Sequence, residues 1–376
     1  MKILHVIPYF YPAWAYGGPP RVAYEIARRQ VKADHQVTVL TTDAYEMDER
    51  LPSGMFNLEG VEVIRVRNLS NLVMWKFHFC TPLTLLRYTD INSFDVIHLH
   101  EGRTLLNALV LIKVKYGRKI IFSPWGTFDY NNQLIFFKKI FDKLFLQNYK
   151  KKIYISTAQN NHELTTLAKF EVGLKKKILP LGIDIDFFKK VPDLKIARRK
   201  MIIDKNDFVF LFLGNFRKVK VGPLLKAFSF FAKNKDRIKL VLVGRDDGFL
   251  DKIKKQIIEY AIEDKVAICG PMYGKNRLYA YAVANVFIYT PTVYEETSGA
   301  SQEALICGVP VIITLQSELP YMSAKDGIFQ IKNNINEITR TMEALYLRKI
   351  KVNSSKLRKY FEWDNVTKQL EEYLKL

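Results

Sequence analysis

Short apolar runs rich in β-branched and aromatic residues recur along the chain and are separated by stretches with helical spacing of apolar positions. This alternation predicts β-α-β units, hence parallel sheets covered by helices on both faces, with ligands gathering at the carboxyl ends of the strands. The predicted strands are residues 3–7, 36–41, 61–66, 95–99, 119–122, 208–214, 238–244, 266–270, 286–289 and 309–313.

Two glutamates eight positions apart stand where a predicted strand passes into a helix. The strand covers residues 286–289 and the helix residues 300–307, so Glu295 falls in the loop and Glu303 in the helix. First-turn amides and the helix dipole attract an anion, whereas a carboxylate suits hydroxyl groups. A nucleotide sugar offers both kinds of group. The candidate phosphate-cradling positions are Ser298, Gly299 and Ala300.

A second candidate phosphate site lies upstream. Residues 208–214 predict a strand, residues 224–228 a helix, and the turn between them is rich in cations. Lys and Arg donate charge-assisted hydrogen bonds to phosphate oxygens. Ordinary exposed cations at the start of a helix are the alternative interpretation. The residues concerned are Gly214, Asn215, Arg217 and Lys220.

The first half of the chain repeats the strand-turn-helix pattern without repeating the sequence. Gly17 and Gly18 follow the first strand and precede a helix predicted over residues 21–30. Glycine permits close approach of the backbone to a ligand, although a plain turn is the alternative. The chain contains no G-x-G-x-x-G and no P-loop pattern, which weakens the dehydrogenase and ATPase interpretations.

Two histidines, His98 and His100, end the predicted strand 95–99. Alternation along the strand places them on one face. His100, nearer the strand end, is the functional candidate, whereas His98 also suits a buried core position. No third His, Cys or Asp at recognisable spacing accompanies them, so we expect no metal site.

The pattern E-x7-E at Glu295 and Glu303, followed by Cys-Gly-Val-Pro-Val at 307–311, resembles the signature of the retaining GT-B glycosyltransferases of group 1, the GT4 family. The resemblance implies an α/β protein of GT-B type, with two Rossmann-like parallel-sheet domains facing a central cleft. It also implies that Glu303 holds the ribose hydroxyls of the donor and that Glu295 contacts the transferred sugar.

The same resemblance suggests further roles. Lys220 and Arg217 would neutralise the leaving diphosphate, with Asn215 at the position of the family's usual arginine, and Trp125 replaces a histidine common in the family. The implied catalytic set is Glu295, Lys220, Arg217 and His100; the donor-binding set is Glu303, Ser298, Gly299, Ala300, Gly214, Asn215, Gly17, Gly18 and Pro271; the acceptor or cleft set is Trp125, Gly126 and Thr127.

The domain boundary is expected near residue 185. Residues 177–184 are similar to the family's crossover between domains, and a charged stretch over 189–205 follows. We therefore expect an N-terminal acceptor-binding domain over residues 1–185 and a C-terminal nucleotide-sugar-binding domain over residues 186–361. By the same resemblance, the helix at 362–376 packs back on the first domain.

Composition indicates a soluble two-domain enzyme. Hydrophobic residues make up 48% of 376 positions, enough for two cores. No apolar run reaches the roughly 18 to 20 residues of a membrane span. His5 and Pro8 interrupt the start of the chain, so we expect no signal peptide. The three scattered cysteines fit a reducing compartment, and we expect a cytoplasmic protein.

The formal charge of +20 is spread over both halves, with 25 Lys or Arg against 16 Asp or Glu in residues 1–184. Residues 136–152 combine aromatic bulk with six lysines. Such a helix could lie on an anionic membrane surface, here the inner face of the cell membrane. A core helix with a solvated lysine face is the alternative.

The functional expectation is a hexosyltransferase that uses a UDP- or GDP-linked sugar and a glycan or lipid-linked acceptor in the synthesis of cell-surface polysaccharides or glycoconjugates. It would need no cofactor and no metal. One alternative is a basic nucleic-acid-binding protein, although no zinc-finger, helix-turn-helix or RNP-like pattern is present and no nucleic-acid partner is expected. The other is a GT-B sugar-nucleotide epimerase, which would consume the nucleotide sugar without an acceptor.

Overall fold

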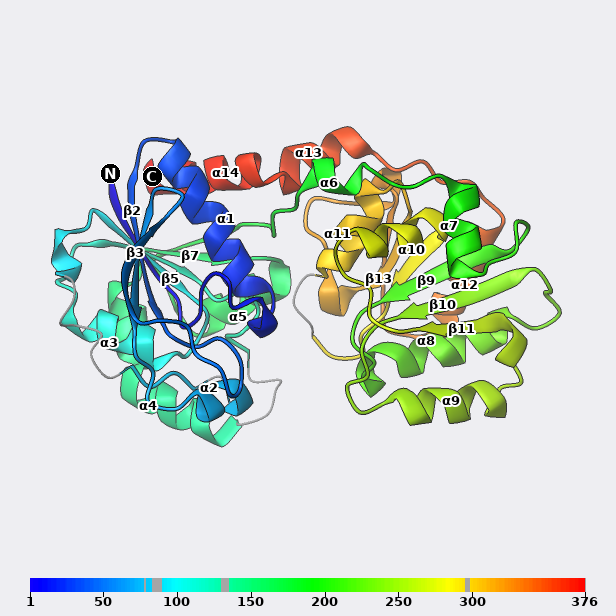
Figure 1. The fold of residues 1–376 in the computed structure, drawn as a ribbon, viewed down its shortest axis with the longest axis horizontal. Helices are drawn as coiled ribbons and strands as arrows, with labels where there is room; N and C mark the ends of the chain where they lie inside the picture. Colours follow the sequence, from blue (N-terminus) through cyan, green and yellow to red (C-terminus); the bar gives the residue numbers. More distant parts are fainter. Residues whose placement is uncertain (78, 83–89, 130–134, 295–297, 376) are drawn as a thin grey trace. The chain divides into compact units, whose positions relative to one another are not determined.

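The chain forms two compact α/β units in the computed structural model, which describes residues 1–77, 79–82, 90–129, 135–294 and 298–375 (Figure 1). The first unit contains Met1–Leu181 and Trp363–Leu376, and the second contains Gly182–Glu362. The boundary thus lies four residues before the position expected from the sequence, and the C-terminal helix belongs to the first unit.

The sheet of the first unit has the order β3-β4-β2-β1-β5-β6-β7-β8 and is parallel except for the antiparallel pairing of β3 with β4. The order reverses between β1 and β5. The strands are β1 Lys2–Val6, β2 Gln36–Thr42, β3 Gly54–Leu58, β4 Val61–Val66, β5 Val96–His100, β6 Lys119–Ser123, β7 Ile155–Ala158 and β8 Lys175–Ile178.

Helices cover both faces of this sheet (Figure 1). They are α1 Gly18–Lys32, α2 Asn71–Phe77, α3 Leu105–Lys113, α4 Ile135–Lys152, α5 Asn161–Lys169 and α14 Trp363–Lys375, with short 3-10 turns at Trp14–Tyr16 and Ile91–Ser93.

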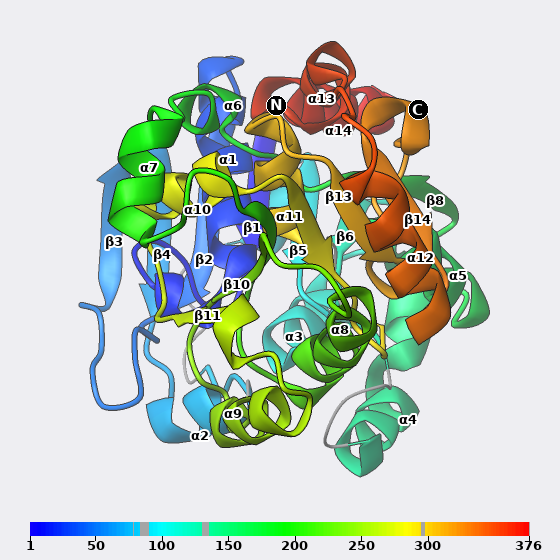
Figure 2. The same ribbon diagram turned by 90° about the vertical axis from the view of Figure 1, so that its right-hand side faces the viewer.

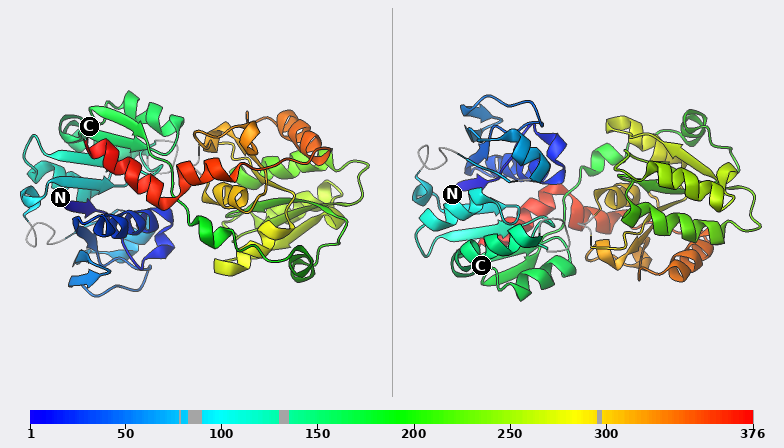
Figure 3. Two further views of the ribbon diagram at one scale, coloured as in Figure 1. Left: turned by 90° about the horizontal axis from the view of Figure 1, so that it is seen from above. Right: turned by 90° about the horizontal axis from the view of Figure 1, so that it is seen from below.

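The C-terminal helix α14 packs on α1 (Figure 3). Trp363 and Val366 share a buried cluster with Val22 of α1. Arg29 of α1 donates to Asp364 at 2.6 Å. The helix therefore completes the core of the first unit.

The sheet of the second unit has the order β11-β10-β9-β12-β13-β14 and is fully parallel. Its order reverses between β9 and β12, which is where ligands bind in open parallel sheets. The strands are β9 Phe208–Leu213, β10 Ile238–Val243, β11 Val266–Cys269, β12 Val286–Tyr289, β13 Val311–Thr314 and β14 Ile328–Ile331.

In this unit α8 and α9 lie on one face of the sheet and α10 and α11 on the other (Figures 1 and 2). The helices are α6 Ile185–Phe188, α7 Leu194–Met201, α8 Lys218–Phe231, α9 Leu250–Glu259, α10 Arg277–Val283, α11 Gly299–Ile306, α12 Ile335–Tyr346 and α13 Ser354–Phe361; 3-10 turns cover Glu263–Lys265, Gly274–Asn276, Leu315–Ser317 and Ala324–Asp326. No helix among the described residues has the length and apolar character needed to span a bilayer.

All ten strands predicted from apolar runs are present, and the predicted α/β class is confirmed. Three of the strands that the sequence did not predict, β3, β8 and β14, lie at sheet edges. Edge strands are covered on fewer sides and tolerate charge, as the Lys-Lys-Lys-Ile sequence of β8 illustrates, so they lack a continuous apolar run.

Candidate active site

Two helices of the second unit begin where its strand order reverses. Helix α8 follows β9 and helix α11 follows β12, and these two strands are paired. The unpaired first-turn amides and the dipole make each helix N-terminus attractive to an anion. The reversal point therefore carries two anion-attracting ends on neighbouring strands.

Helix α8 begins at Lys218, six residues earlier than the sequence predicted. The predicted start was wrong, because the helix already includes the cation-rich turn and continues through Gly222 and Pro223. Proline has no N–H for the carbonyl of Val219, four residues earlier. That carbonyl accepts a hydrogen bond from the Thr292 amide at 2.9 Å instead, which ties the start of α8 to the loop after β12.

Lys220 lies in the first turn of α8, and its ammonium is 5.5 Å from the ring centroid of Tyr289, the last residue of β12. This contact orients the lysine toward the reversal point. Gly214 precedes the turn, and Asn215 beside it is partly exposed. Gly244, at the end of β10, permits close approach, because a Cβ there would lie 1.9 Å from the Gly214 carbonyl oxygen.

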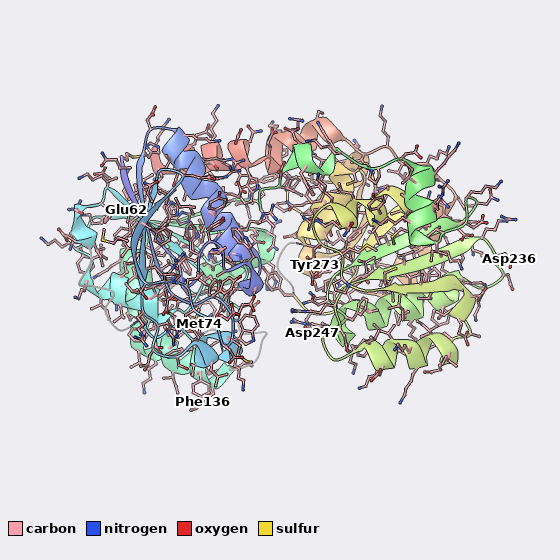
Figure 4. The ribbon with its side chains drawn as sticks, viewed as in Figure 1. Glu62, Met74, Phe136, Asp236, Asp247 and Tyr273 are labelled. Carbon is pink, nitrogen blue, oxygen red and sulfur yellow. The ribbon has the colours of Figure 1, made fainter. Side chains whose placement is uncertain are left out.

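Arg217 occupies the N-cap position of α8 without a capping hydrogen bond from its side chain, and it forms an ion pair with Asp247, in the loop after β10. The side chain of Arg217 is half exposed. Pro271 and Tyr273 are exposed after β11, and Tyr273 and Asp247 lie on the same side of the second unit (Figure 4). The loops after β9, β10 and β11 thus follow one another along the carboxyl edge of the sheet.

Helix α11 begins at Gly299, one residue before the predicted start. Ser298 is its N-cap, and the Ser298 Oγ accepts from the Ser301 amide at 3.3 Å. Within the described part of the chain, the amides of Gly299 and Ala300 have no hydrogen-bond partner. Glu295 lies outside the described residues.

Glu303 is nearly buried inside α11, and both of its carboxylate oxygens have partners from α10. Arg277 Nη1 lies 2.9 Å from Oε1, and the Tyr281 hydroxyl donates to Oε2 at 2.7 Å. Burial, and then the charge of Glu303, raises the pKa of Tyr281 well above its usual value, so the phenol keeps its proton. Arg277 also stacks over Phe188, with its Cζ 4.8 Å from the ring centroid.

Sequence reasoning missed Arg277 and Tyr281. Their spacing of four residues places them on one face of a helix, and the sequence alone could have predicted this. Their proximity to Glu303 depends on how α10 packs beside α11, and no local pattern reveals it.

In the first unit, Gly17 and Gly18 mark the start of α1. Gly17 is the N-cap with φ of 101°, a conformation that favours glycine. A Cβ at either position would meet no described atom within 4 Å, so the backbone here borders open space. This geometry suits the predicted approach of a ligand.

Three histidines form a buried cluster at the reversal point of the first sheet. β1 pairs with β5 so that His5 lies opposite His98, and the ring centroids of His98 and His100 are 4.0 Å apart. The sequence shows no third ligand at recognisable spacing, but strand pairing brings His5 to His98 and His100 from a distant part of the chain.

The hydrogen bonds assign a tautomer to two of these rings. The Trp125 indole can only donate, and it contacts His100 Nδ1 at 3.0 Å. His100 therefore carries its proton on Nε2 and donates to His5 Nδ1 at 2.9 Å. His5 in turn donates from Nε2 to Gln30 Oε1 at 2.7 Å. The series of hydrogen bonds thus starts at the Trp125 indole as donor and ends at the Gln30 carbonyl as acceptor.

This cluster does not fit a metal site, although its ligand atoms lie within 4.8 Å of one another. A histidine that binds a metal normally donates its other ring N–H to an acceptor. His100 instead accepts from the Trp125 indole, so a metal at its Nε2 would require a doubly deprotonated imidazole. The hydrogen bonds of the three histidines thus favour a network of neutral rings over a metal site.

The predicted catalytic role of His100 is contradicted by its environment. The side chain has no exposed surface, and both ring nitrogens are occupied by protein partners. His98 is a buried histidine bonded to Ser123 Oγ at 2.7 Å, as the alternative interpretation expected. Both residues hold the strand ends together rather than face a substrate.

The acceptor candidates form a structural turn after β6. Trp125 is only 3% exposed, so the prediction that it lines a cleft was wrong: its ring packs against the C-terminal helix in the cluster that contains Trp363. Thr127 Oγ1 accepts from the Gly102 amide at 2.6 Å. Gly126 donates to Glu163, a buried residue that the sequence analysis missed. The Asn160-x-x-Glu163 pattern at the start of α5 was the available signal.

Acidification should destabilise the first unit through this cluster. Burial lowers the pKa of His5 to about 4 and lowers those of His98 and His100 well below the ordinary value of 6.5. Below pH 6.5 the three histidines become protonated in the unfolded chain but stay neutral in the folded cluster. The free energy of unfolding therefore falls as the pH falls. Each histidine contributes up to about 1.4 kcal/mol per pH unit.

The measurement is urea unfolding followed by tryptophan fluorescence from pH 8 to pH 5, above the range of most carboxylates (ordinary pKa about 4). His98→Asn should reduce the pH slope by up to one proton, and His162→Asn, which changes a histidine with a side chain 40% exposed, serves as the control. A flat wild-type profile would contradict the buried neutral cluster.

Comparison with known proteins follows the division into two units. The family model described as "Glycosyltransferase Family 4" matches residues 16–187, and the model described as "Glycosyl transferases group 1" matches residues 193–361. An uncharacterized glycosyltransferase of Methanocaldococcus jannaschii is 24% identical over 98% of this chain and 96% of its own length.

Two further proteins are informative. The GDP-mannose:cellobiosyl-diphosphopolyprenol alpha-mannosyltransferase of Xanthomonas oryzae pv. oryzae is 22% identical over 92% of this chain and 88% of its own. The structure of Anabaena HepE in complex with UDP superposes with a TM-score of 0.73 at 15% identity, covering 100% of both chains.

The chain has two Rossmann-like parallel-sheet units. The second unit brings two helix N-termini and the Glu303 carboxylate to the point where its strand order reverses. This architecture is that of the GT-B glycosyltransferase class. The chain is a glycosyltransferase of group 1, since the two family models together cover nearly all of it. The nucleic-acid-binding and epimerase alternatives are not favoured by these findings.

Proposed function

We propose that the chain is a retaining hexosyltransferase that takes its sugar from a UDP- or GDP-linked donor and passes it to a glycan or lipid-linked acceptor in polysaccharide or glycoconjugate synthesis. The observation that carries the proposal is the grouping of Lys220, the α11 amides and Glu303 at one strand reversal. A diphosphate matches the first two, and sugar hydroxyls match the third.

In the proposed reaction, the bond between the anomeric carbon and the donor phosphate oxygen breaks while the acceptor hydroxyl oxygen bonds to that carbon from the same face. The hydroxyl proton leaves with the diphosphate. Lys220, Arg217 and the amides of Gly299 and Ala300 stabilise the negative charge that develops on the leaving group. Glu295 is proposed to contact the transferred sugar. Protein cations would take the role of a metal.

Glu303 is proposed to hold the ribose. A carboxylate has about four acceptor positions, and Arg277 and Tyr281 occupy one on each oxygen. The two ribose hydroxyls are proposed to donate hydrogen bonds to the same carboxylate. The α10 residues would then fix the carboxylate before the donor arrives, which lowers the entropic cost of binding.

UDP and GDP are both proposed as the nucleotide of the donor, because similar proteins are named for each of them. The Xanthomonas relative is named for GDP-mannose and for a diphosphopolyprenol acceptor, and HepE was solved with UDP. We therefore propose a uridine or guanosine diphosphate sugar. A lipid diphosphate or a free glycan is the proposed acceptor class.

Glu303→Gln should weaken nucleotide-sugar binding by roughly 10- to 100-fold, because hydrogen bonds to a charged group contribute about 1.5 to 3 kcal/mol. Tyr281→Phe should weaken nucleotide-sugar binding by only about threefold to tenfold, since it removes one hydrogen bond to the Glu303 carboxylate but leaves the carboxylate in place. Glu343→Gln makes the same chemical change on α12, where Glu343 forms a partly exposed pair with Lys235, and it should have no effect. Isothermal titration with the preferred donor measures all three.

The function is tested with UDP-, GDP- and ADP-sugars in the presence of a chelator. We expect calorimetric stabilisation by one UDP- or GDP-linked donor, and release of its nucleoside diphosphate once a polyprenol-linked or glycan acceptor is added. NMR of the product should show the donor's anomeric configuration. Loss of activity on chelation, or an inverted product, would overturn the proposed mechanism. The absence of binding to every nucleotide sugar would overturn the function.

A further inference from the structure

Helix α4 presents an apolar face to solvent. Its inner side packs into the first unit through Phe141 and Tyr149, as a core helix should. Besides Ile135 at its first position, which is 47% exposed, its outer side carries four large apolar side chains that no described part of the unit covers. They are Phe136 (70% exposed), Phe137 (64%), Ile140 (42%) and Leu144 (63%).

These four residues form one stripe. At 100° per residue, Phe136, Ile140 and Leu144 follow each other along one side of the helix, and Phe137 lies next to Leu144 in projection. Figure 4 shows Phe136 at the outer edge of the first unit. A contiguous exposed stripe of this kind marks an interaction surface rather than scattered surface hydrophobes.

The six lysines of α4 divide into two groups. Lys138 donates to the Asp129 carbonyl, Lys150 pairs with Glu171, and Lys152 donates to carbonyls at the end of α3. These three tie the helix to its own unit. The other three, Lys139, Lys143 and Lys151, are exposed.

No negative charge offsets the exposed lysines on this helix. Asp142 is its only acidic residue, and its side chain is buried against Arg103, with an Nε to Oδ1 distance of 2.8 Å. The outer face of α4 therefore combines an apolar stripe with uncompensated positive charge. The alternative of a core helix with a purely solvated lysine face does not account for the exposed phenylalanines.

We propose that the outer face of α4 docks on an anionic lipid bilayer. The phenylalanine, isoleucine and leucine side chains would enter the boundary between headgroups and acyl chains, and the three exposed lysines would contact acidic headgroups. A second copy of the chain fits less well, because two such faces would oppose lysine with lysine. The inference rests on helix α4 alone and does not depend on the proposed donor chemistry.

The test is flotation of the full chain with vesicles of phosphatidylcholine alone and of phosphatidylcholine mixed with phosphatidylglycerol. Wild type should bind the mixed vesicles and not the neutral ones. Replacing Lys139, Lys143 and Lys151 by Gln should weaken binding by roughly a hundredfold, which corresponds to about 1 kcal/mol per lysine near the surface. Phe136→Ser with Phe137→Ser and Leu144→Ser should weaken binding by at least about tenfold.

Matched controls come from the second unit. Lys252, Lys254 and Lys255 are exposed on α9, and their replacement by Gln makes the same charge change. Ile202, Ile258 and Leu347 are 91%, 66% and 77% exposed, and their replacement by Ser removes comparable apolar surface. Neither control should alter vesicle binding.

The proposal is overturned if wild type binds no vesicles, if it binds neutral and anionic vesicles equally, or if the α4 variants behave as their controls do. Concentration-dependent self-association that the serine variant abolishes, without vesicle binding, would assign the face to a second copy. Because none of these readouts involves a nucleotide sugar, their failure leaves the donor experiments unaffected.

Discussion

Lys220→Ala is expected to lower kcat by roughly 100- to 1000-fold, the range found when one charge-stabilising donor is removed from an active site. The lysine lies in the first turn of α8 at the strand reversal, and its contact with Tyr289 directs it toward the space that the leaving diphosphate is proposed to occupy. The charge on that group grows in the transition state, so the loss should fall mainly on kcat and less on KM.

Lys226→Ala is the matched control for this prediction. Lys226 is exposed on the same helix, six residues further along, and its removal changes the net charge equally. Lys220→Arg should retain intermediate activity, because it keeps the charge but not the compact ammonium. The measurement is steady-state release of nucleoside diphosphate. A Lys220→Ala enzyme within threefold of wild type would remove this lysine from the proposed mechanism.

The second large effect is expected from Asp142→Ala, which should lower the free energy of unfolding of the first unit by about 3 to 5 kcal/mol. Arg103 contacts the carboxylate with two donors, at 2.8 and 2.9 Å, and the two side chains are only 5% and 8% exposed. Removing one partner leaves the guanidinium buried without its counter-charge. The same pair fixes α4 to the body of the unit.

Tryptophan fluorescence isolates this effect, because Trp14, Trp75, Trp125 and Trp363 all belong to the first unit. Urea unfolding followed at these residues therefore reports on one unit. Replacing both partners by apolar residues, as Arg103→Met with Asp142→Leu, should recover most of the loss.

The surface pair of Lys150 with Glu171, in the same unit, provides the contrast. Glu171→Ala should leave the urea concentration at which the unit unfolds nearly unchanged, since exposed ion pairs contribute little to stability. An Asp142→Ala variant that unfolds at the same urea concentration as wild type would show that the buried pair does not anchor α4.

Local patterns in the sequence determined the strand positions and the chemical character of the site. Ten apolar runs became strands because a strand buried in a parallel sheet must be apolar on both faces. Lys220 and Ser298 were found because a cation or cap at a strand-to-helix junction is visible along the chain. The start of α8 was misjudged, because the packing of the second unit tolerates Pro223 inside the helix and gives its unpaired Val219 carbonyl a partner.

Contacts between distant segments were decided only by the tertiary structure. His5 reached His98 through strand pairing, Arg277 reached Glu303 through the packing of α10 beside α11, and Trp125 turned inward toward the C-terminal helix. The outward direction of Phe136 also depended on which side of α4 the core covers. The periodicity of one element shows which of its residues share a face, but the neighbouring elements determine what that face meets.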